Sequence, residues 1–199
     1  MTGGQWGKTA MARHRILVIV GSVREGRISL PIANWVMDRI AGRAEFEAEL
    51  LDLAIWDLPM FAEPNPPATG RYTGEKQRAW AEKIGAADGY ILVAPEYNHG
   101  MSAALKNALD TVYAEWGRKP AAFVAHGGMG GARSVEQLRQ VTAAMAMAPL
   151  SSAVHLQGAA KLRDGDRFNA GEIEDRRLSA LFDELLWWGR ALNAARGGN

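Results

Sequence analysis

The residue types best suited to chemistry lie in polar loops that follow apolar runs of this 199-residue chain. The first loop, residues 21–29, reads GSVREGRIS and offers two hydroxyls, Ser22 and Ser29, and two guanidiniums, Arg24 and Arg27. Such groups before a helix N-terminus are typical of phosphate sites, because free N–H groups and arginines both bind phosphate oxygens. The same residues also fit an ordinary strand-to-helix turn with Ser29 as the N-cap.

The second loop, residues 94–100, reads APEYNHG. Pro95 stiffens it, and its backbone groups together with Tyr97 and Asn98 suit the polar edge of a flat heteroaromatic ring. A proline-containing turn, in which Asn98 and Gly100 serve the backbone alone, is the other interpretation. Taken together, the two loops indicate one ligand with a phosphate at one end and a ring at the other, which describes flavin mononucleotide.

A third loop, residues 126–131, reads HGGMGG. Its glycines favour either a close backbone approach to a ligand or a flexible turn. We predict no metal site, since the four histidines lie in separate segments and cysteine is absent. We predict no catalytic acid or base, because the chemistry of a flavin site belongs to the ring. The lack of cysteine also fits a reducing cytoplasm, which is the predicted location.

The segments around these loops alternate between strand and helix patterns. This alternation predicts an α/β fold, a doubly wound five-stranded parallel sheet with helices on both faces, and places all three loops at one sheet edge. The predicted strands are 15–20, 46–53, 90–94, 121–125 and 153–156, and the predicted helices are 29–40, 73–87, 102–113, 134–147 and 172–195.

Outside these elements, residues 1–14 read as a flexible leader and 15–199 as a single domain. Residues 56–70 hold four prolines and are expected to form an irregular segment, either functional or mobile. Trp187 and Trp188 cannot both face one core, so one of them is expected to serve a subunit contact. The net charge of +1 argues against nucleic acid or a membrane as a partner.

The loops also resemble a known family. Gly21-Ser22-x-Arg24, the run Pro95-Glu96-Tyr97-Asn98-x-Gly100, and Lys106-Asn107-x-x-Asp110 are similar to motifs of the NADPH-dependent FMN reductase family, which has a flavodoxin-like fold. The resemblance spans residues 15–195. One departure from the short family form of the first loop is the insertion of residues 25–28.

The resemblance implies which residues bind FMN. Ser22, Arg24 and Ser29 would hold the phosphate, residues 95–98 would line the ring, and Gly127 and Gly128 would close its other side. The predicted cofactor-binding residues are Ser22, Arg24, Arg27, Ser29, Pro95, Glu96, Tyr97, Asn98, Gly100, Gly127 and Gly128.

The family further implies an enzyme that takes hydride from NADPH or NADH and reduces a second acceptor by a ping-pong mechanism. The acceptor would be a free flavin, quinone, azo compound or metal oxyanion, and the assembly a homodimer or homotetramer. Two alternatives are a flavodoxin-like FMN electron carrier without nicotinamide oxidation and a flavin-free binding protein with the same fold. The balanced charge favours the enzyme, because carriers that dock charged partners often have one-sided charge.

Overall fold

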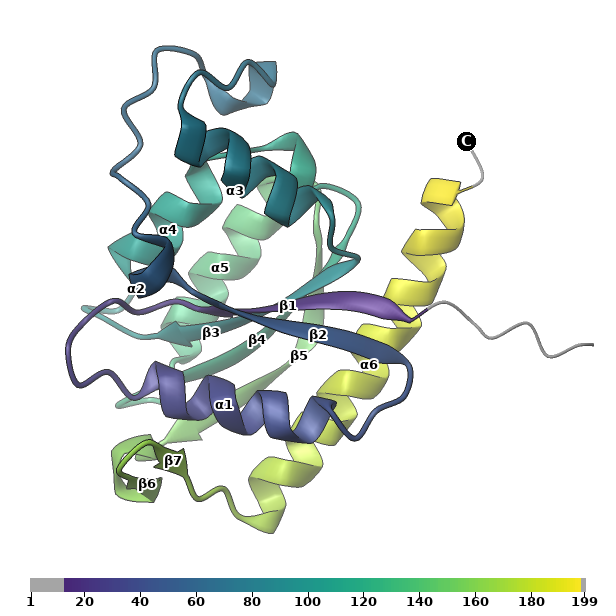
Figure 1. The fold of residues 1–199 in the computed structure, drawn as a ribbon. Helices are drawn as coiled ribbons and strands as arrows, with labels where there is room; N and C mark the ends of the chain where they lie inside the picture. The colour runs from purple at the N-terminus through teal and green to yellow at the C-terminus, as the bar shows by residue number, and fades with distance from the viewer. Residues whose placement is uncertain (1–12, 198–199) are drawn as a thin grey trace, which may run out of the picture.

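A five-stranded parallel sheet forms the centre of the molecule (Figure 1). The computed structural model describes residues 13–197. The strand order is β2-β1-β3-β4-β5, and all four neighbouring pairs run parallel. This order confirms the predicted doubly wound α/β fold. The strands are β1 (His14–Val20), β2 (Phe46–Asp52), β3 (Gly89–Pro95), β4 (Pro120–Gly127) and β5 (Ala148–Gln157).

Helices cover both faces of this sheet. Strand side chains alternate between two cores: Ile16 and Val18 belong to one, and Leu17 and Ile19 to the other. Both faces are therefore apolar, which explains why the strands read as continuous hydrophobic runs. In Figure 1, α1 (Ser29–Ile40) and α6 (Glu172–Gly197) lie on one face, and α3 (Glu75–Gly85), α4 (Ala103–Asp110) and α5 (Ala132–Ala144) on the other.

Two predicted boundaries near the end of the sheet were wrong. The helix expected over 134–147 ends at Ala144, and the strand expected over 153–156 begins at Ala148. Pro149, which follows the predicted helix, lies inside β5. Because β5 is an edge strand that pairs with β4 alone, a residue without an N–H group is tolerated there.

A short hairpin between β5 and α6 was missed. Its strands, β6 (Arg163–Asp164) and β7 (Arg167–Phe168), pair in antiparallel fashion. Phe168 is buried and lies with its ring centroid 5.4 Å from that of Trp35 on α1. The hairpin is too short to produce a periodic sequence pattern.

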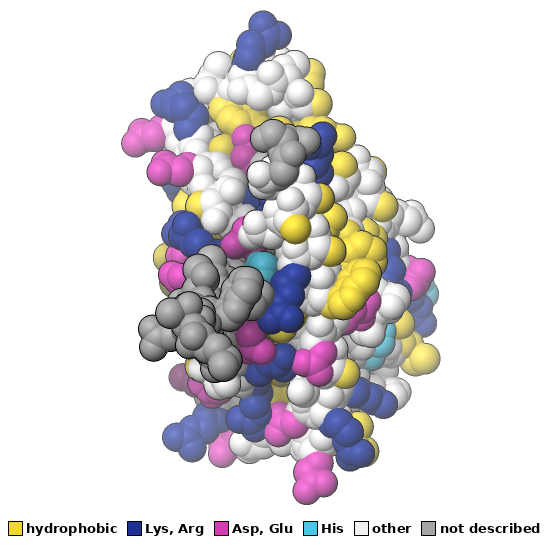
Figure 2. Space-filling view, turned by 90° about the vertical axis from the view of Figure 1, so that its right-hand side faces the viewer, with side chains coloured by type: hydrophobic (Ala, Val, Ile, Leu, Met, Phe, Trp, Pro, Cys, Tyr) yellow, Lys and Arg dark blue, Asp and Glu magenta, His cyan; other side chains and the backbone are white. Residues whose placement is uncertain are grey.

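The described part of the chain begins just before β1 and ends with α6. Residues 1–12 of the predicted leader lie outside the described residues, whereas His14 is the first residue of β1. Within residues 13–197 no helix is long and apolar enough to span a membrane. On α6, Trp187 is 64% exposed while Trp188 packs against the core. Figure 2 shows this side of the molecule, where hydrophobic side chains gather among charged ones.

Candidate functional site

The three polar loops meet at the carboxyl edge of the sheet through hydrogen bonds between distant residues. Ser22 Oγ lies 2.7 Å from the Tyr97 hydroxyl, which joins the first loop to the second. Ser29 Oγ lies 2.8 Å from His126 Nε2, which joins the first loop to the third. The Glu96 N–H donates to the His126 carbonyl over 2.9 Å and closes the set. The predicted convergence of the loops is therefore confirmed.

The two arginines of the first loop have different surroundings. Arg27 Nη2 lies 2.5 Å from Asp52 Oδ2, and the two side chains are 17% and 5% exposed. Arg24 is exposed, and the one hydrogen bond that its guanidinium makes within the described residues goes to the Glu25 carbonyl. Arg27 thus fastens the loop to the end of β2, and Arg24 is the guanidinium left free for an anion.

The backbone of the first loop adds open donors. Within residues 13–197, no backbone carbonyl accepts a hydrogen bond from the N–H groups of residues 22–26 and 28. The loop leads into α1, in which Pro31 has no N–H group and the Ile32 N–H donates to the Ile28 carbonyl, so the helix adds the N–H groups of Ser29 and Leu30. Successive open N–H groups at a helix N-terminus beside a guanidinium suit a phosphate dianion. The serine hydroxyls lie deeper, because Ser22 and Ser29 are fully buried.

The second loop is a tight turn. The Tyr97 and Gly100 backbones exchange two hydrogen bonds, and the residues between them, Asn98 and His99, have positive φ angles of 49° and 69°. Asparagine tolerates this left-handed conformation, so Asn98 has a backbone reason for its position. A Cβ on Gly100 would lie 2.6 Å from Gln137 Oε1, so Gly100 packs against α5. Pro95 is buried as the last residue of β3.

The carboxylate of Glu96 holds the second loop against α5. It accepts hydrogen bonds from both the side chain and the backbone N–H of Arg133. Burial raises the pKa of Glu96, but the bonds from Arg133 outweigh it and hold that pKa below its ordinary value. Glu96 therefore stays ionised and engaged, and what it offers a ligand is its backbone.

The glycines of the third loop occupy their positions for different structural reasons. A Cβ on Gly127 would lie 2.8 Å from Glu96 Cβ, so the two loops touch through this glycine. Gly131 has a φ of 78°, and a Cβ there would lie 2.6 Å from Ala125 Cβ. A Cβ on Gly128 meets nothing within 4 Å. Packing thus accounts for Gly127 and Gly131, whereas Gly128 faces open space.

A cavity of about 760 Å³ opens beside the third loop. This volume falls in the range of small-molecule sites, and the lining contains Lys161 but no carboxylate. It is therefore compatible with a flat or anionic ligand. The lining residues are Ile28, His126, Gly127, Gly128 and 157–162.

Sequence reasoning did not single out His126 as a site residue. It is buried at the end of β4, and burial, with a smaller effect of the Arg24 charge, lowers its pKa to about 4. The imidazole is thus neutral near pH 7. The sequence feature that could have identified His126 is its position directly after an apolar strand and before the glycines.

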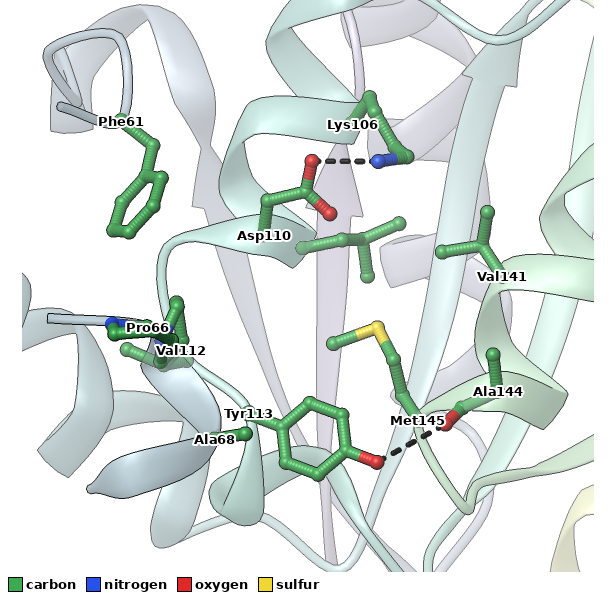
Figure 3. A pocket seen from close by; sticks show the side chains of 12 residues that line it. Phe61, Pro66, Ala68, Lys106, Asp110, Val112, Tyr113, Val141, Ala144 and Met145 are labelled. Atoms are coloured by element: carbon green, nitrogen blue, oxygen red, sulfur yellow. Dashed lines mark hydrogen bonds and ion pairs between the residues drawn. The ribbon is translucent and has the colours of Figure 1, made fainter.

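A second, more apolar cavity of about 470 Å³ lies between α4, α5 and the proline-rich segment (Figure 3). The side chains of Phe61 and Met145 line it, as does the ion pair of Lys106 with Asp110. Asn107 fixes this segment, since its side chain accepts from the Phe61 N–H and donates to the Pro59 carbonyl. The family-like Lys-Asn-x-x-Asp motif therefore orders the segment, and this cavity lies away from the three loops.

Comparisons with known proteins agree with this architecture. Residues 14–161 match the family model described as NADPH-dependent FMN reductase. An NAD(P)H-dependent FMN reductase of Schizosaccharomyces pombe is 44% identical over 135 residues, covering 67% of this chain and 68% of that protein. An NADPH azoreductase of a Bacillus species is 32% identical over 162 residues, covering 76% and 81%.

A solved structure shows the same fold at lower sequence identity. FerB of Paracoccus denitrificans, a flavoenzyme NAD(P)H:(acceptor) oxidoreductase, superposes with a TM-score of 0.71 at 21% identity. The alignment covers 89% of this chain and 98% of FerB. The likeness therefore includes nearly the whole of the sheet and its covering helices.

Proposed function

The chain belongs to the NADPH-dependent FMN reductase family, and from this premise we propose that it oxidises NADPH or NADH and reduces a second small-molecule acceptor by a ping-pong mechanism. As a member of that family it is an NAD(P)H-dependent flavin oxidoreductase with FMN as its cofactor. The acceptor, the order of steps and the residues of the site are our proposals.

The observation that best supports FMN is the first loop. Its open N–H groups, the N-terminus of α1 and the free Arg24 match the charge and acceptor atoms of a phosphate. We assign the phosphate to these groups, with Ser22 and Ser29 beneath them. Arg27 belongs to the site through its bond to Asp52, which shapes the loop.

The second and third loops would hold the ring. Tyr97 is 39% exposed, and its hydroxyl reaches Ser22, so it can form a wall between the phosphate and ring ends. Pro95, Glu96 and Asn98 shape the backbone on one side, with Gly100 closing their turn. Gly127 and Gly128 line the cavity on the other side.

When bound, FMN supplies the two-electron chemistry of hydride acceptance from a nicotinamide and electron delivery to an acceptor. The residues of the chain bind the FMN and orient it. Glu96 is ionised and tied to Arg133, and His126 is neutral and tied to Ser29, so we assign neither a proton-transfer role. The absence of a catalytic acid or base therefore stays part of the proposal.

A ping-pong mechanism requires the nicotinamide to leave before the acceptor binds. The name of the Bacillus relative supports an azo compound as one acceptor, and the family resemblance supports quinones and free flavin. Initial rates measured over a grid of NADPH and 1,4-benzoquinone concentrations should give parallel double-reciprocal lines. Intersecting lines would show a ternary complex and overturn the ping-pong proposal.

The electron-carrier alternative predicts a different result with the same protein. Bound FMN would then be reduced by dithionite but by neither NADPH nor NADH. The two nicotinamides, tested side by side, would also reveal which of them is preferred.

We further propose a homodimer or homotetramer. The apolar cavity of Figure 3 and the neighbouring Met60, which is 73% exposed, offer a surface that a second copy can cover. Sedimentation at micromolar concentration should show a dimer or larger species, and Phe61→Glu should shift it toward the monomer. A wild-type monomer would contradict the proposal. The cytoplasmic location stays a prediction.

A further inference from the structure

The hairpin β6–β7 makes a direct contact with the first loop. Arg163 Nη1 donates to the Gly26 carbonyl over 2.8 Å, and Arg163 Nε donates to the Gly165 carbonyl, also over 2.8 Å. One guanidinium thus bridges the hairpin turn and a loop that lies 137 residues earlier in the chain. The matched family region ends at residue 161, just before this arginine.

The hairpin that presents Arg163 is itself anchored. Arg163 pairs across the hairpin with Phe168, which is buried against Trp35 of α1. The Asn169 N–H also donates to the Leu162 carbonyl, which closes the base of the hairpin. Figure 1 shows the hairpin next to α1, the helix into which the first loop runs. Arg163 is therefore fixed relative to that helix.

The bond to Gly26 matters because of where that residue lies. Gly26 has a φ of 66°, a conformation in which the peptide groups of the loop change direction. A backbone carbonyl carries partial negative charge, so a carbonyl turned toward a bound phosphate would oppose it. In the structure this carbonyl is engaged by Arg163, and the open N–H groups of residues 22–26 and 28 remain.

The positive charge of Arg163 also favours an anion at the first loop. Arg27, the second arginine of the loop, is neutralised by Asp52, whereas Arg163 has no ion pair within the described residues. The charged residues near it in sequence are Lys161, Asp164, Asp166 and Arg167, and Glu25 precedes the Gly26 that it contacts; all five are exposed. Arg163 therefore contributes a positive charge at the loop that the loop's own Arg27 does not.

We propose that Arg163 is a positioning residue for the FMN phosphate, which it serves by holding the Gly26 carbonyl on the hairpin side of the loop. This inference rests on the proposed function, because it presumes that the loop binds the phosphate. It assigns a role to a residue beyond the matched family region.

A comparison of two ligands tests the role. FMN and riboflavin share the ring and the ribityl chain, and only FMN has the phosphate. For Arg163→Ala, quenching of flavin fluorescence should show FMN binding weakened at least tenfold, with riboflavin binding unchanged. Arg163→Gln should behave in the same way, because it has no charge and cannot bridge both carbonyls.

Arg167→Ala is the matched control, since it removes an exposed arginine from the same hairpin. It should leave both affinities unchanged. If Arg163→Ala leaves FMN binding intact, or weakens FMN and riboflavin by the same factor, the role in phosphate binding is overturned. Wild-type protein that binds neither flavin would instead refute the proposed function itself, so the two failures are distinguishable.

Discussion

Ser29 and His126 lie 97 residues apart in sequence and 2.8 Å apart in the structure, where they join the loop after β1 to the loop after β4. Both residues are buried, so the bond is shielded from water. A neutral imidazole has one N–H and one acceptor nitrogen, and if Nε2 carries the proton, the Ser29 hydroxyl keeps its own proton to donate elsewhere. The pair thus links the phosphate end of the site to its cavity.

The pKa of His126 gives a pH dependence of stability. Its pKa is lowered from 6.5 to about 4 in the folded protein, so the unfolded chain binds more protons between these values. Stability should therefore be full above pH 6.5 and fall as the pH drops toward 4, by on the order of 3 kcal/mol from this group.

Urea unfolding of the FMN-free protein across this pH range measures that effect. His126→Gln can keep a bond to Ser29 but has no proton to gain. The stability of the variant should fall less steeply than that of wild type. Parallel curves for the two proteins would show that His126 does not titrate as described.

Arg24→Ala should weaken FMN binding without loss of stability. The guanidinium is exposed and makes no ion pair within the described residues, so its removal leaves no buried group unpaired. Loss of a charged hydrogen bond of about 1.5–3 kcal/mol corresponds to roughly tenfold to hundredfold weaker binding. Arg177→Ala, an exposed arginine on α6, is the control. Unchanged affinity in an equilibrium titration would remove Arg24 from the site.

Arg27→Ala should lower the stability of the folded protein more than it weakens FMN binding, which is the reverse of Arg24→Ala. It would leave Asp52, which is 5% exposed, without its cation, at a cost of about 2–4 kcal/mol. Lys83→Ala breaks the more exposed pair with Glu49 and should cost less than about 1 kcal/mol. Thermal unfolding of the two variants compares them directly. Equal small losses would mean that the Arg27–Asp52 pair does not fasten the loop.

Asn107→Ala should loosen the proline-rich segment. It removes the two hydrogen bonds to the Phe61 N–H and the Pro59 carbonyl, a loss of about 1–3 kcal/mol. Limited proteolysis should then cut within residues 57–72 faster than in wild type. Asn65→Ala, which loses one exposed bond to the Arg71 carbonyl, should be cut at the wild-type rate. If both variants are cut alike, Asn107 is not what orders the segment.

The sequence predicted the architecture well because strand and loop signals coincide. Apolar runs such as 15–20 and 90–94 end at glycine or proline, and parallel strands bring those ends to one edge. The partners of the loop side chains could not be predicted. Asp52 meets Arg27 because β2 runs beside β1 with Val20 opposite Asp52, and that register is a property of the folded sheet.

The other features that the sequence did not predict also depend on contacts that exist only in the folded protein. The bond between Ser29 and His126 depends on the position of β4 in the sheet, two strands away from β1. The strand containing Pro149 is allowed because β5 lies at an edge and its register with β4 is irregular next to this proline. The hairpin that presents Arg163 is stabilised by one aromatic contact, between Phe168 and Trp35, rather than by a repeating pattern.

The most direct test of the central claim is an anaerobic visible spectrum of the protein with bound FMN, recorded before and after addition of NADPH or NADH. We predict that the flavin absorption band bleaches within seconds and returns when 1,4-benzoquinone is added. A bound flavin that stays yellow with both nicotinamides would contradict nicotinamide oxidation and leave the electron-carrier alternative.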